Sequence, residues 1–183
     1  MQHYCLFETA IGACGVAWSE RGVTRLQLPE RSRSATESRL REQGANSSAG
    51  GPPAAVRSAI RLLKCYFVGE AVDLSGVALD LGGVSPFHRK IYDAARALAW
   101  GKTATYGELA RRVGARDAAR AVGQAMGKNP VPIIIPCHRV LAAGGKIGGF
   151  SAHGGADTKQ RLLTLEGVHL SHGTLPLPGL GAP

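Results

Sequence analysis

The sequence contains few cysteines, few aromatic residues and no long hydrophobic run. Its four cysteines, at positions 5, 14, 65 and 137, form no C-x-x-C pair, which argues against a disulfide framework. We therefore expect reduced thiols, no bound metal and a cytoplasmic protein. No apolar segment approaches the roughly 20 residues needed to span a bilayer. Residues 1–8 also lack the basic-then-apolar layout of a secretory signal.

The net charge of +9 is distributed unevenly, because acidic residues are scarce in one part of the chain. Residues 87–161 contain thirteen Lys and Arg but only four Asp and Glu, whereas residues 1–86 contain nine and eight. Such an excess suits either a polyanionic partner or a solubilising surface, and charge alone does not separate the two. Because the basic part also carries a candidate nucleophile, Cys137, we favour nucleic acid as the partner.

The first third of the chain is predicted to form a small sheet. Apolar stretches alternate with glycine-containing turn signals, which is typical of short antiparallel strands. The predicted strands cover residues 4–8, 13–18 and 23–28, with a further strand expected over 72–81. A loop is predicted over residues 30–52, with helix near 36–42. Residues 54–68 have apolar side chains at helical spacing, and Gly69 is expected to end that helix.

After residue 84 the pattern becomes helical. Ser85 is predicted to cap a helix over residues 86–99 that has proline at its first position. Thr105 and Glu108 have the spacing of a capping box, which opens a second helix. A glycine-rich loop is expected over residues 148–155, followed by a last helix over 157–166.

A third helix, over residues 118–127, is expected to complete a helix-turn-helix, with Asp117 as its cap. One face of this helix carries very small side chains around a single long cation, Arg120. Such a face suits either close packing of helices or insertion into a groove of DNA. The small residues are Ala118, Ala119, Ala121, Gly123 and Ala125.

Residues 129–140 place a cysteine just after a short apolar segment. Three consecutive isoleucines at 133–135 predict a buried strand, whose pairing Pro136 is expected to end. Cys137 would then lie where a rigid strand opens into a loop, followed by His138 and Arg139. Cationic neighbours lower the pKa of a thiol, and the thiolate is the nucleophilic form. A buried structural cysteine is the alternative, but the flanking proline and charges favour a reactive thiol.

These segments together resemble the O6-alkylguanine-DNA alkyltransferase family. Over roughly residues 86–167 the resemblance is carried by Thr105-Tyr106-Gly107-Glu108-Leu109-Ala110, Ala119-Arg120-Ala121-Val122-Gly123, Met126, Asn129-Pro130-Val131-Pro132 and Pro136-Cys137-His138-Arg139-Val140. It implies a small N-terminal α/β domain of ribonuclease-H-like shape and a mainly α-helical C-terminal domain with a helix-turn-helix. We expect these domains over residues 1–84 and 85–169. The composition of residues 170–183 predicts a disordered tail.

The resemblance also implies a reaction. Such proteins enter the minor groove of double-stranded DNA, rotate an O6-alkylguanine out of the duplex, and transfer its alkyl group irreversibly to cysteine in a single turnover. Here Cys137 would be the acceptor, and water would relay its proton to His138. Glu166 would hold the imidazole, Tyr106 would give a proton to guanine N3, and Asn129 would brace the active loop. No cofactor is required, and the protein is expected to act as a monomer.

Two further sets of residues follow from the resemblance. Arg120 would fill the gap left in the base stack. Contacts to DNA are expected from Arg120, Ala118, Ala119, Ala121, Tyr106 and Lys128. The extruded base, which could also be O4-alkylthymine, is expected to contact Met126, Pro132, Val140 and Ser151.

The chain departs from the family pattern in its glycine-rich loop. Many relatives have Asn-Tyr-Ser-Gly-Gly there, whereas this loop is longer and has Ala152 at a position where glycine is frequent.

Two other functions stay open on the sequence alone. One is a non-enzymatic reader of alkylated DNA, in which the cysteine is usually replaced by tryptophan. The other is a Cys-His hydrolase that turns over repeatedly.

Overall fold

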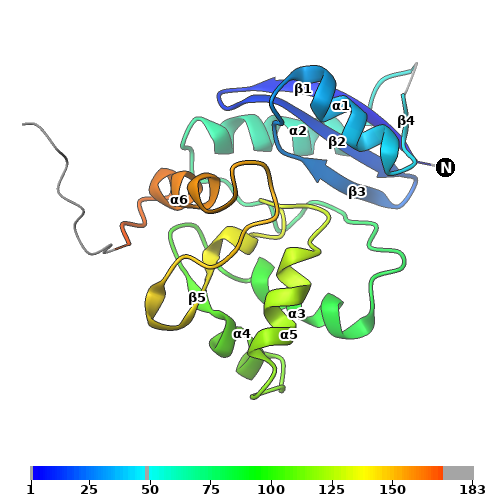
Figure 1. Ribbon diagram of the computed structural model, residues 1–183. Coiled ribbons are helices and arrows are strands. Elements are labelled where there is room, and N and C mark those ends of the chain that lie inside the picture. Colours follow the sequence, from blue (N-terminus) through cyan, green and yellow to red (C-terminus); the bar gives the residue numbers. More distant parts are fainter. Residues whose placement is uncertain (1, 48–49, 171–183) are drawn as a thin grey trace, which may run out of the picture.

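The computed structural model describes residues 2–47 and 50–170 of the chain. Except for Leu170, the predicted disordered tail lies outside the described residues. Figure 1 shows a sheet with two helices in the upper part of the molecule and a group of helices below it. Within the described residues, none of the helices has the length and apolar character needed to cross a bilayer.

The sheet is a three-strand antiparallel meander with a short fourth strand on its edge. Strands β1 (His3–Thr9), β2 (Gly12–Ser19) and β3 (Gly22–Gln27) confirm the three predicted strands. Strand β4 (Asn46–Ser47), which the sequence did not indicate, pairs parallel to β1, so the order is β3-β2-β1-β4. The N-terminal part is therefore an α/β unit with a mixed sheet.

The two faces of this sheet are covered differently. Helix α1 (Arg33–Glu42) packs Leu40 against Tyr4 and Ala17 in a small separate cluster. This packing is close, because a Cβ added at Gly15 would lie 2.3 Å from Leu40 Cδ1. Helix α2 (Ala54–Phe67) lies on the other face and joins the main hydrophobic core. Side chains alternate across a strand, so successive residues of β1 serve the two clusters in turn.

The main core is shared by both parts of the chain. It contains Val16 and Leu26 of the sheet and Leu63 of α2, together with Ile91, Val131 and many other buried residues from the second half. The strand predicted over residues 72–81 is wrong. Only an isolated bridge joins Leu79 to Val23, and the rest of this segment is irregular.

The helical part begins as the capping signals predict. Helix α3 (Pro86–Arg96) starts after Ser85, whose side chain accepts a hydrogen bond from the His88 amide, although the helix ends three residues earlier than expected. Helix α4 (Tyr106–Arg112) has the complete capping box of Thr105 and Glu108. Both caps satisfy amide groups that the first turn of a helix leaves free.

Helix α5 (Ala119–Gly127) packs against α4 and completes the helix-turn-helix. The prediction that Asp117 caps it is wrong. Ala118 occupies the N-cap position and offers no side-chain acceptor, so the start of α5 depends on tertiary packing instead.

The strand predicted at residues 133–135 is also wrong. These isoleucines form a buried tight turn, closed by a bridge between Pro132 and Ile135, in which Ile133 has a positive φ of 72°. A 3₁₀ turn, η1 (Cys137–Arg139), follows directly. A turn can bury the three side chains as well as a strand can. A short apolar run therefore predicts that residues are buried, but it does not determine their backbone conformation.

After η1 the chain forms a short strand, a second 3₁₀ turn and the last helix. Strand β6 (Val140–Leu141) pairs parallel to β5 (Ala104–Thr105), which brings the residues after η1 beside the start of α4. A second 3₁₀ turn, η2 (Ala143–Gly145), and the glycine-rich loop lead to helix α6 (Gly155–Leu165). Helix α6 contacts η1 and so reaches the back of the cysteine loop.

Candidate active site

The loop that carries Cys137 is held by backbone and amide hydrogen bonds. The Cys137 amide donates to Ile135 O at 2.8 Å. The Asn129 side chain donates to Ile135 O at 2.8 Å and accepts from the Val131 amide at 3.0 Å. Asn129 is itself buried, so both ends of its side-chain amide fix the turn that precedes the cysteine.

Cys137 lies in the wall of an open cavity of about 580 Å³ beside the helix-turn-helix. The cavity brings together several residues that the sequence pointed to. They are Tyr106, Ala119, Arg120, Met126, Cys137 and Ser151. Pro132 and Lys128 line a neighbouring groove instead. Ala118 and Ala121 line neither of these hollows, and the buried residues His138, Asn129, Val140 and Glu166 lie outside the cavity.

The thiol itself is only 4% exposed, and burial raises its pKa. A hydrogen bond from Asn129 and the charge of Lys159 act in the opposite direction, without reversing the shift in pKa. The expectation that the cationic neighbours in sequence lower the pKa of Cys137 is therefore wrong. Arg139 is paired with Glu166, and His138 is neutral, so neither presents free positive charge to the sulfur. The thiol needs a base in order to react.

His138, the next residue of η1, is our candidate for that base. Its ring is fully buried, and burial lowers its pKa, so the imidazole is neutral at neutral pH. Its Nε2 lies 2.7 Å from Glu166 Oε1. A carboxylate only accepts hydrogen bonds, so Nε2 carries the proton and Nδ1 keeps its lone pair. Within the described part of the chain, Nδ1 has no hydrogen-bond partner.

Glu166 is the centre of a buried polar network. Burial alone would raise its pKa, but hydrogen bonds from His138 and Arg139 outweigh that effect and lower the pKa to about 2. Arg139 donates to both carboxylate oxygens, at 2.8 and 3.0 Å, and the Gly101 amide donates at 3.2 Å. The carboxylate is therefore ionised and held from several directions.

Sequence reasoning missed two residues of this site, Tyr66 and Lys159. The Tyr66 hydroxyl donates to Glu166 Oε1 at 2.7 Å. The Lys159 amino group donates to Val140 O at 2.6 Å and lies 5.7 Å from the centre of the Tyr106 ring. Burial lowers the pKa of Lys159 to about 8. A signal existed for Lys159, because it lies three and four residues before two buried leucines of α6 and so shares their face.

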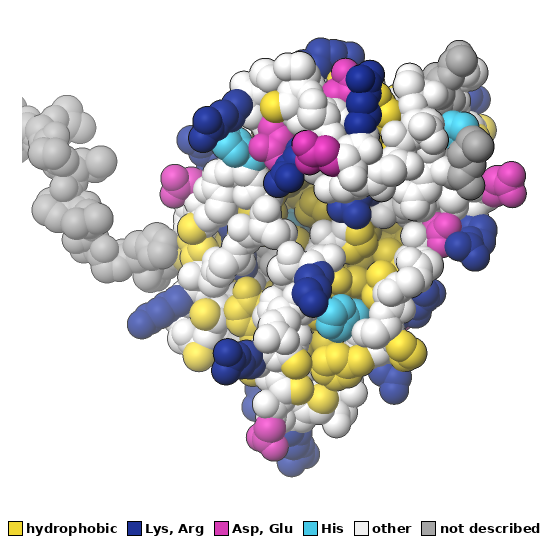
Figure 2. Space-filling model, turned by 45° about the vertical axis from the view of Figure 1, so that its right-hand side comes forward, with side chains coloured by type: hydrophobic (Ala, Val, Ile, Leu, Met, Phe, Trp, Pro, Cys, Tyr) yellow, Lys and Arg dark blue, Asp and Glu magenta, His cyan; other side chains and the backbone are white. Residues whose placement is uncertain are grey.

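The opposite rim of the cavity is built by α5 and the glycine-rich loop. Arg120 is exposed at the start of α5, next to the half-buried Ala119. The loop approaches Tyr106 closely, because a Cβ at Gly148 would lie 2.8 Å from its hydroxyl oxygen. Burial raises the pKa of Tyr106, so its hydroxyl stays protonated at neutral pH. Figure 2 shows Lys and Arg side chains spread over a face of the molecule that has a hydrophobic hollow in its middle.

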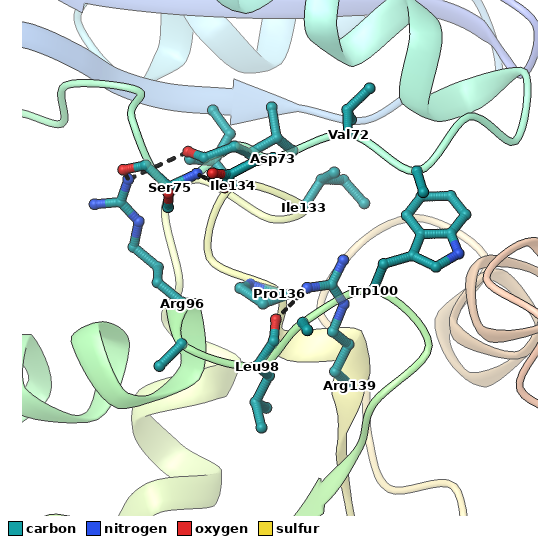
Figure 3. Close-up of a pocket in the computed structure, with 14 residues that line it drawn as sticks. Val72, Asp73, Ser75, Arg96, Leu98, Trp100, Ile133, Ile134, Pro136 and Arg139 are labelled. Atoms are coloured by element: carbon teal, nitrogen blue, oxygen red, sulfur yellow. Dashed lines mark hydrogen bonds between the residues drawn. The ribbon is translucent and has the colours of Figure 1, made fainter.

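A second cavity, of about 440 Å³, lies behind the cysteine loop and is drawn in Figure 3. Two arginines line it, but both are engaged by the protein. Arg139 donates to Leu98 O, and Arg96 donates to carbonyl groups of Leu74, Ser75 and Val77. These bonds hold the segment after α2 against the helical part. We therefore interpret this cavity as part of the structural contact between the two parts of the chain.

Comparison with known proteins agrees with this geometry. The model of the 6-O-methylguanine DNA methyltransferase DNA-binding domain matches residues 86–168. A methylated-DNA–protein-cysteine methyltransferase of Mycobacterium bovis is 36% identical over 166 residues, which cover 91% of this chain and 93% of that protein. One from Mycolicibacterium paratuberculosis is 46% identical over 117 residues, covering 64% and 68%.

A solved structure extends the likeness to the fold. The crystal structure of Mycobacterium tuberculosis OGT in complex with DNA superposes with a TM-score of 0.72 at 36% identity, covering 90% of this chain and 92% of that one. An α/β unit, a DNA-binding helical domain and a thiol at the helix-turn-helix define a DNA repair methyltransferase. The chain belongs to the O6-methylguanine DNA methyltransferase family.

Proposed function

We propose that this protein repairs O6-alkylguanine in double-stranded DNA by moving the alkyl group to Sγ of Cys137. The observation that carries the proposal is the position of this thiol. It lies in a cavity lined by Tyr106 and Arg120, and it is followed by a neutral histidine held by Glu166. The cavity of about 580 Å³ is within the range of small-molecule sites, so it suits one extruded base.

The reaction is a direct displacement. The sulfur–carbon bond forms as the bond between the alkyl carbon and guanine O6 breaks. A water molecule passes the thiol proton to Nδ1 of His138, which has no other partner among the described residues. Tyr106 gives its phenolic proton to N3 of the departing guanine and recovers a proton from His138 through solvent. The resulting thioether has no leaving group of comparable quality, so each molecule acts once.

Binding to DNA prepares this step. We assign the extrusion of the base to Arg120, which is exposed at the start of α5 and takes the place of the base in the stack. Small side chains let α5 approach the groove of DNA closely; they are those of Ala118, Ala119 and Ala121. Lys128 contacts phosphate. Met126, Pro132, Val140 and Ser151 are proposed to contact the base. O4-alkylthymine presents a similar alkyl–oxygen bond and is a second candidate substrate.

We divide the chain into an N-terminal domain over residues 1–84 and a DNA-binding domain over residues 85–169. A monomer is sufficient, because one chain supplies every proposed site residue. Four free cysteines suit a reducing compartment, and we therefore assign the protein to the cytoplasm.

Intact-mass measurement tests the proposal directly. The protein is mixed with a duplex that contains one O6-methylguanine, and the expected result is a gain of one methyl group on the peptide that contains Cys137. Cys5, Cys14 and Cys65 serve as internal controls in the same digest. Tight binding without a gain in mass would support the non-enzymatic reader. Continued turnover beyond one equivalent would support the hydrolase. Cys137→Ser is expected to bind DNA and gain no mass.

A further inference from the structure

One side chain from the N-terminal part enters the buried network around His138. Tyr66 lies in the last turn of α2 and is 0% exposed. Its ring packs edge-on against Trp100, with centroids 5.3 Å apart, and against His138, at 6.2 Å. Tyr66 is separated from Glu166 by 100 residues in sequence, so only the docking of the two parts brings it to this position.

The Tyr66 hydroxyl has two neighbours, and their chemistry determines its orientation. It lies 2.7 Å from Glu166 Oε1 and 3.1 Å from His138 Nε2. An ionised carboxylate can only accept, so the hydroxyl donates to Glu166. The oxygen then turns a lone pair toward Nε2. The Nε2 proton therefore faces two acceptors, one from each part of the chain.

Arg139 already holds Glu166, so the contribution of Tyr66 is a different one. Both oxygens of Glu166 accept from Arg139, and the Gly101 amide adds another donor. Without Tyr66 the carboxylate would remain ionised and in place. The imidazole, in contrast, has hydrogen bonds only to Glu166 and Tyr66 among the described residues. Loss of the hydroxyl removes one of the two contacts that orient the ring.

We propose that Tyr66 is a positioning residue for alkyl transfer, through which the N-terminal domain orients His138 so that Nδ1 faces the water that deprotonates Cys137. This inference rests on the proposed function. It gives the N-terminal domain a part in the chemistry, because that domain supplies one of the two groups that hold the base.

The test compares Tyr66→Phe with wild-type protein in single-turnover transfer from a duplex that contains O6-methylguanine. Phenylalanine keeps the ring packing and removes only the hydroxyl. We expect transfer to be about tenfold slower at neutral pH, with unchanged affinity for DNA. Because the thiol ionises without help at alkaline pH, the deficit is expected to shrink as the pH rises. A structural defect alone would give the same deficit at every pH.

Tyr4→Phe is the matched control. Tyr4 is also buried in the N-terminal part, and its hydroxyl donates to Glu37 at 2.8 Å and accepts from Arg41 at 2.7 Å, on the far side of the sheet. This variant loses an equivalent hydrogen bond and is expected to keep the wild-type rate and pH profile. Equal rates for wild type and Tyr66→Phe, or a deficit independent of pH, would overturn the role of Tyr66 and leave the proposed function standing.

The tautomer of His138 gives a second measurement on the wild-type protein, in case Tyr66→Phe does not fold. In ¹⁵N-histidine-labelled protein, the expected state near neutral pH is a single neutral ring with the proton on Nε2. A proton on Nδ1 would contradict the inference. Absence of any transfer by wild-type protein would be a different failure, that of the proposed function.

Discussion

Replacement of Glu166 by Gln is expected to destabilise the protein in a pH-dependent way. Glu166 is 4% exposed, and its pKa falls to about 2 in the folded protein, from an ordinary value of 4.5. One pKa unit corresponds to about 1.4 kcal/mol, so the ionised carboxylate contributes about 3 kcal/mol to the free energy of unfolding near neutral pH. Glutamine keeps the shape but cannot neutralise Arg139.

The direction of the Glu166 pKa shift determines how the stabilisation changes with pH. A carboxyl group with a depressed pKa stabilises the fold fully above its unfolded pKa, and this contribution disappears as the pH falls through the folded pKa. The difference in unfolding free energy between wild type and Glu166→Gln is therefore expected to be about 3 kcal/mol at neutral pH. It should decrease steadily from about pH 4.5 down to about pH 2.

Urea unfolding, followed by circular dichroism at a series of pH values, measures this difference. The exposed Glu20 provides a matched variant, Glu20→Gln, which is expected to show almost no difference at any pH. A Glu166→Gln deficit that stays constant down to the lowest pH would refute the reasoning, because it would show that the carboxylate charge does not stabilise the network.

Three further predictions concern the reaction with DNA. Arg120→Ala is expected to slow repair in duplex DNA by tenfold or more while leaving transfer from a free O6-alkylguanine base almost unchanged; equal losses would exclude a role in extrusion. Lys159→Met is expected to slow transfer about tenfold below pH 8, where the amine is charged and favours the thiolate, and to match wild type above it; a deficit that persists at alkaline pH would point to packing instead. Affinity for undamaged duplex is expected to fall steeply with added salt, because Lys and Arg displace counterions from phosphate; a flat salt response would contradict a phosphate-dominated interface.

Local signals in the sequence predicted the parts of this fold that depend on local chemistry. The caps at Ser85 and Thr105 are each built from residues within one turn of a helix, so their spacing alone identifies them. The meander of β1, β2 and β3 follows from alternation and turn residues in the same way. Cys137 stood out because proline and charged residues are unusual around a cysteine that is merely buried.

Contacts that no sequence pattern encodes decided the rest of the fold and of the site. The isoleucines at 133–135 are buried as predicted, yet they turn instead of extending, because Asn129 and the bridge of Pro132 to Ile135 close the backbone locally. Tyr66 reaches its partners only through the docking of α2, which no spacing along the chain encodes. The pKa of Cys137 likewise depends on burial and on the pairing of Arg139, and a list of its sequence neighbours gives the wrong direction.

The shared core has a consequence for how the chain can be divided. A fragment that starts at Pro86 would retain the helix-turn-helix and the cysteine loop. It would, however, expose to solvent the apolar surface that α2 and the sheet now cover. Exposed surface of that kind favours aggregation. We therefore expect alkyl transfer to require both parts of the chain. Heat or denaturant should unfold the two parts in one cooperative transition.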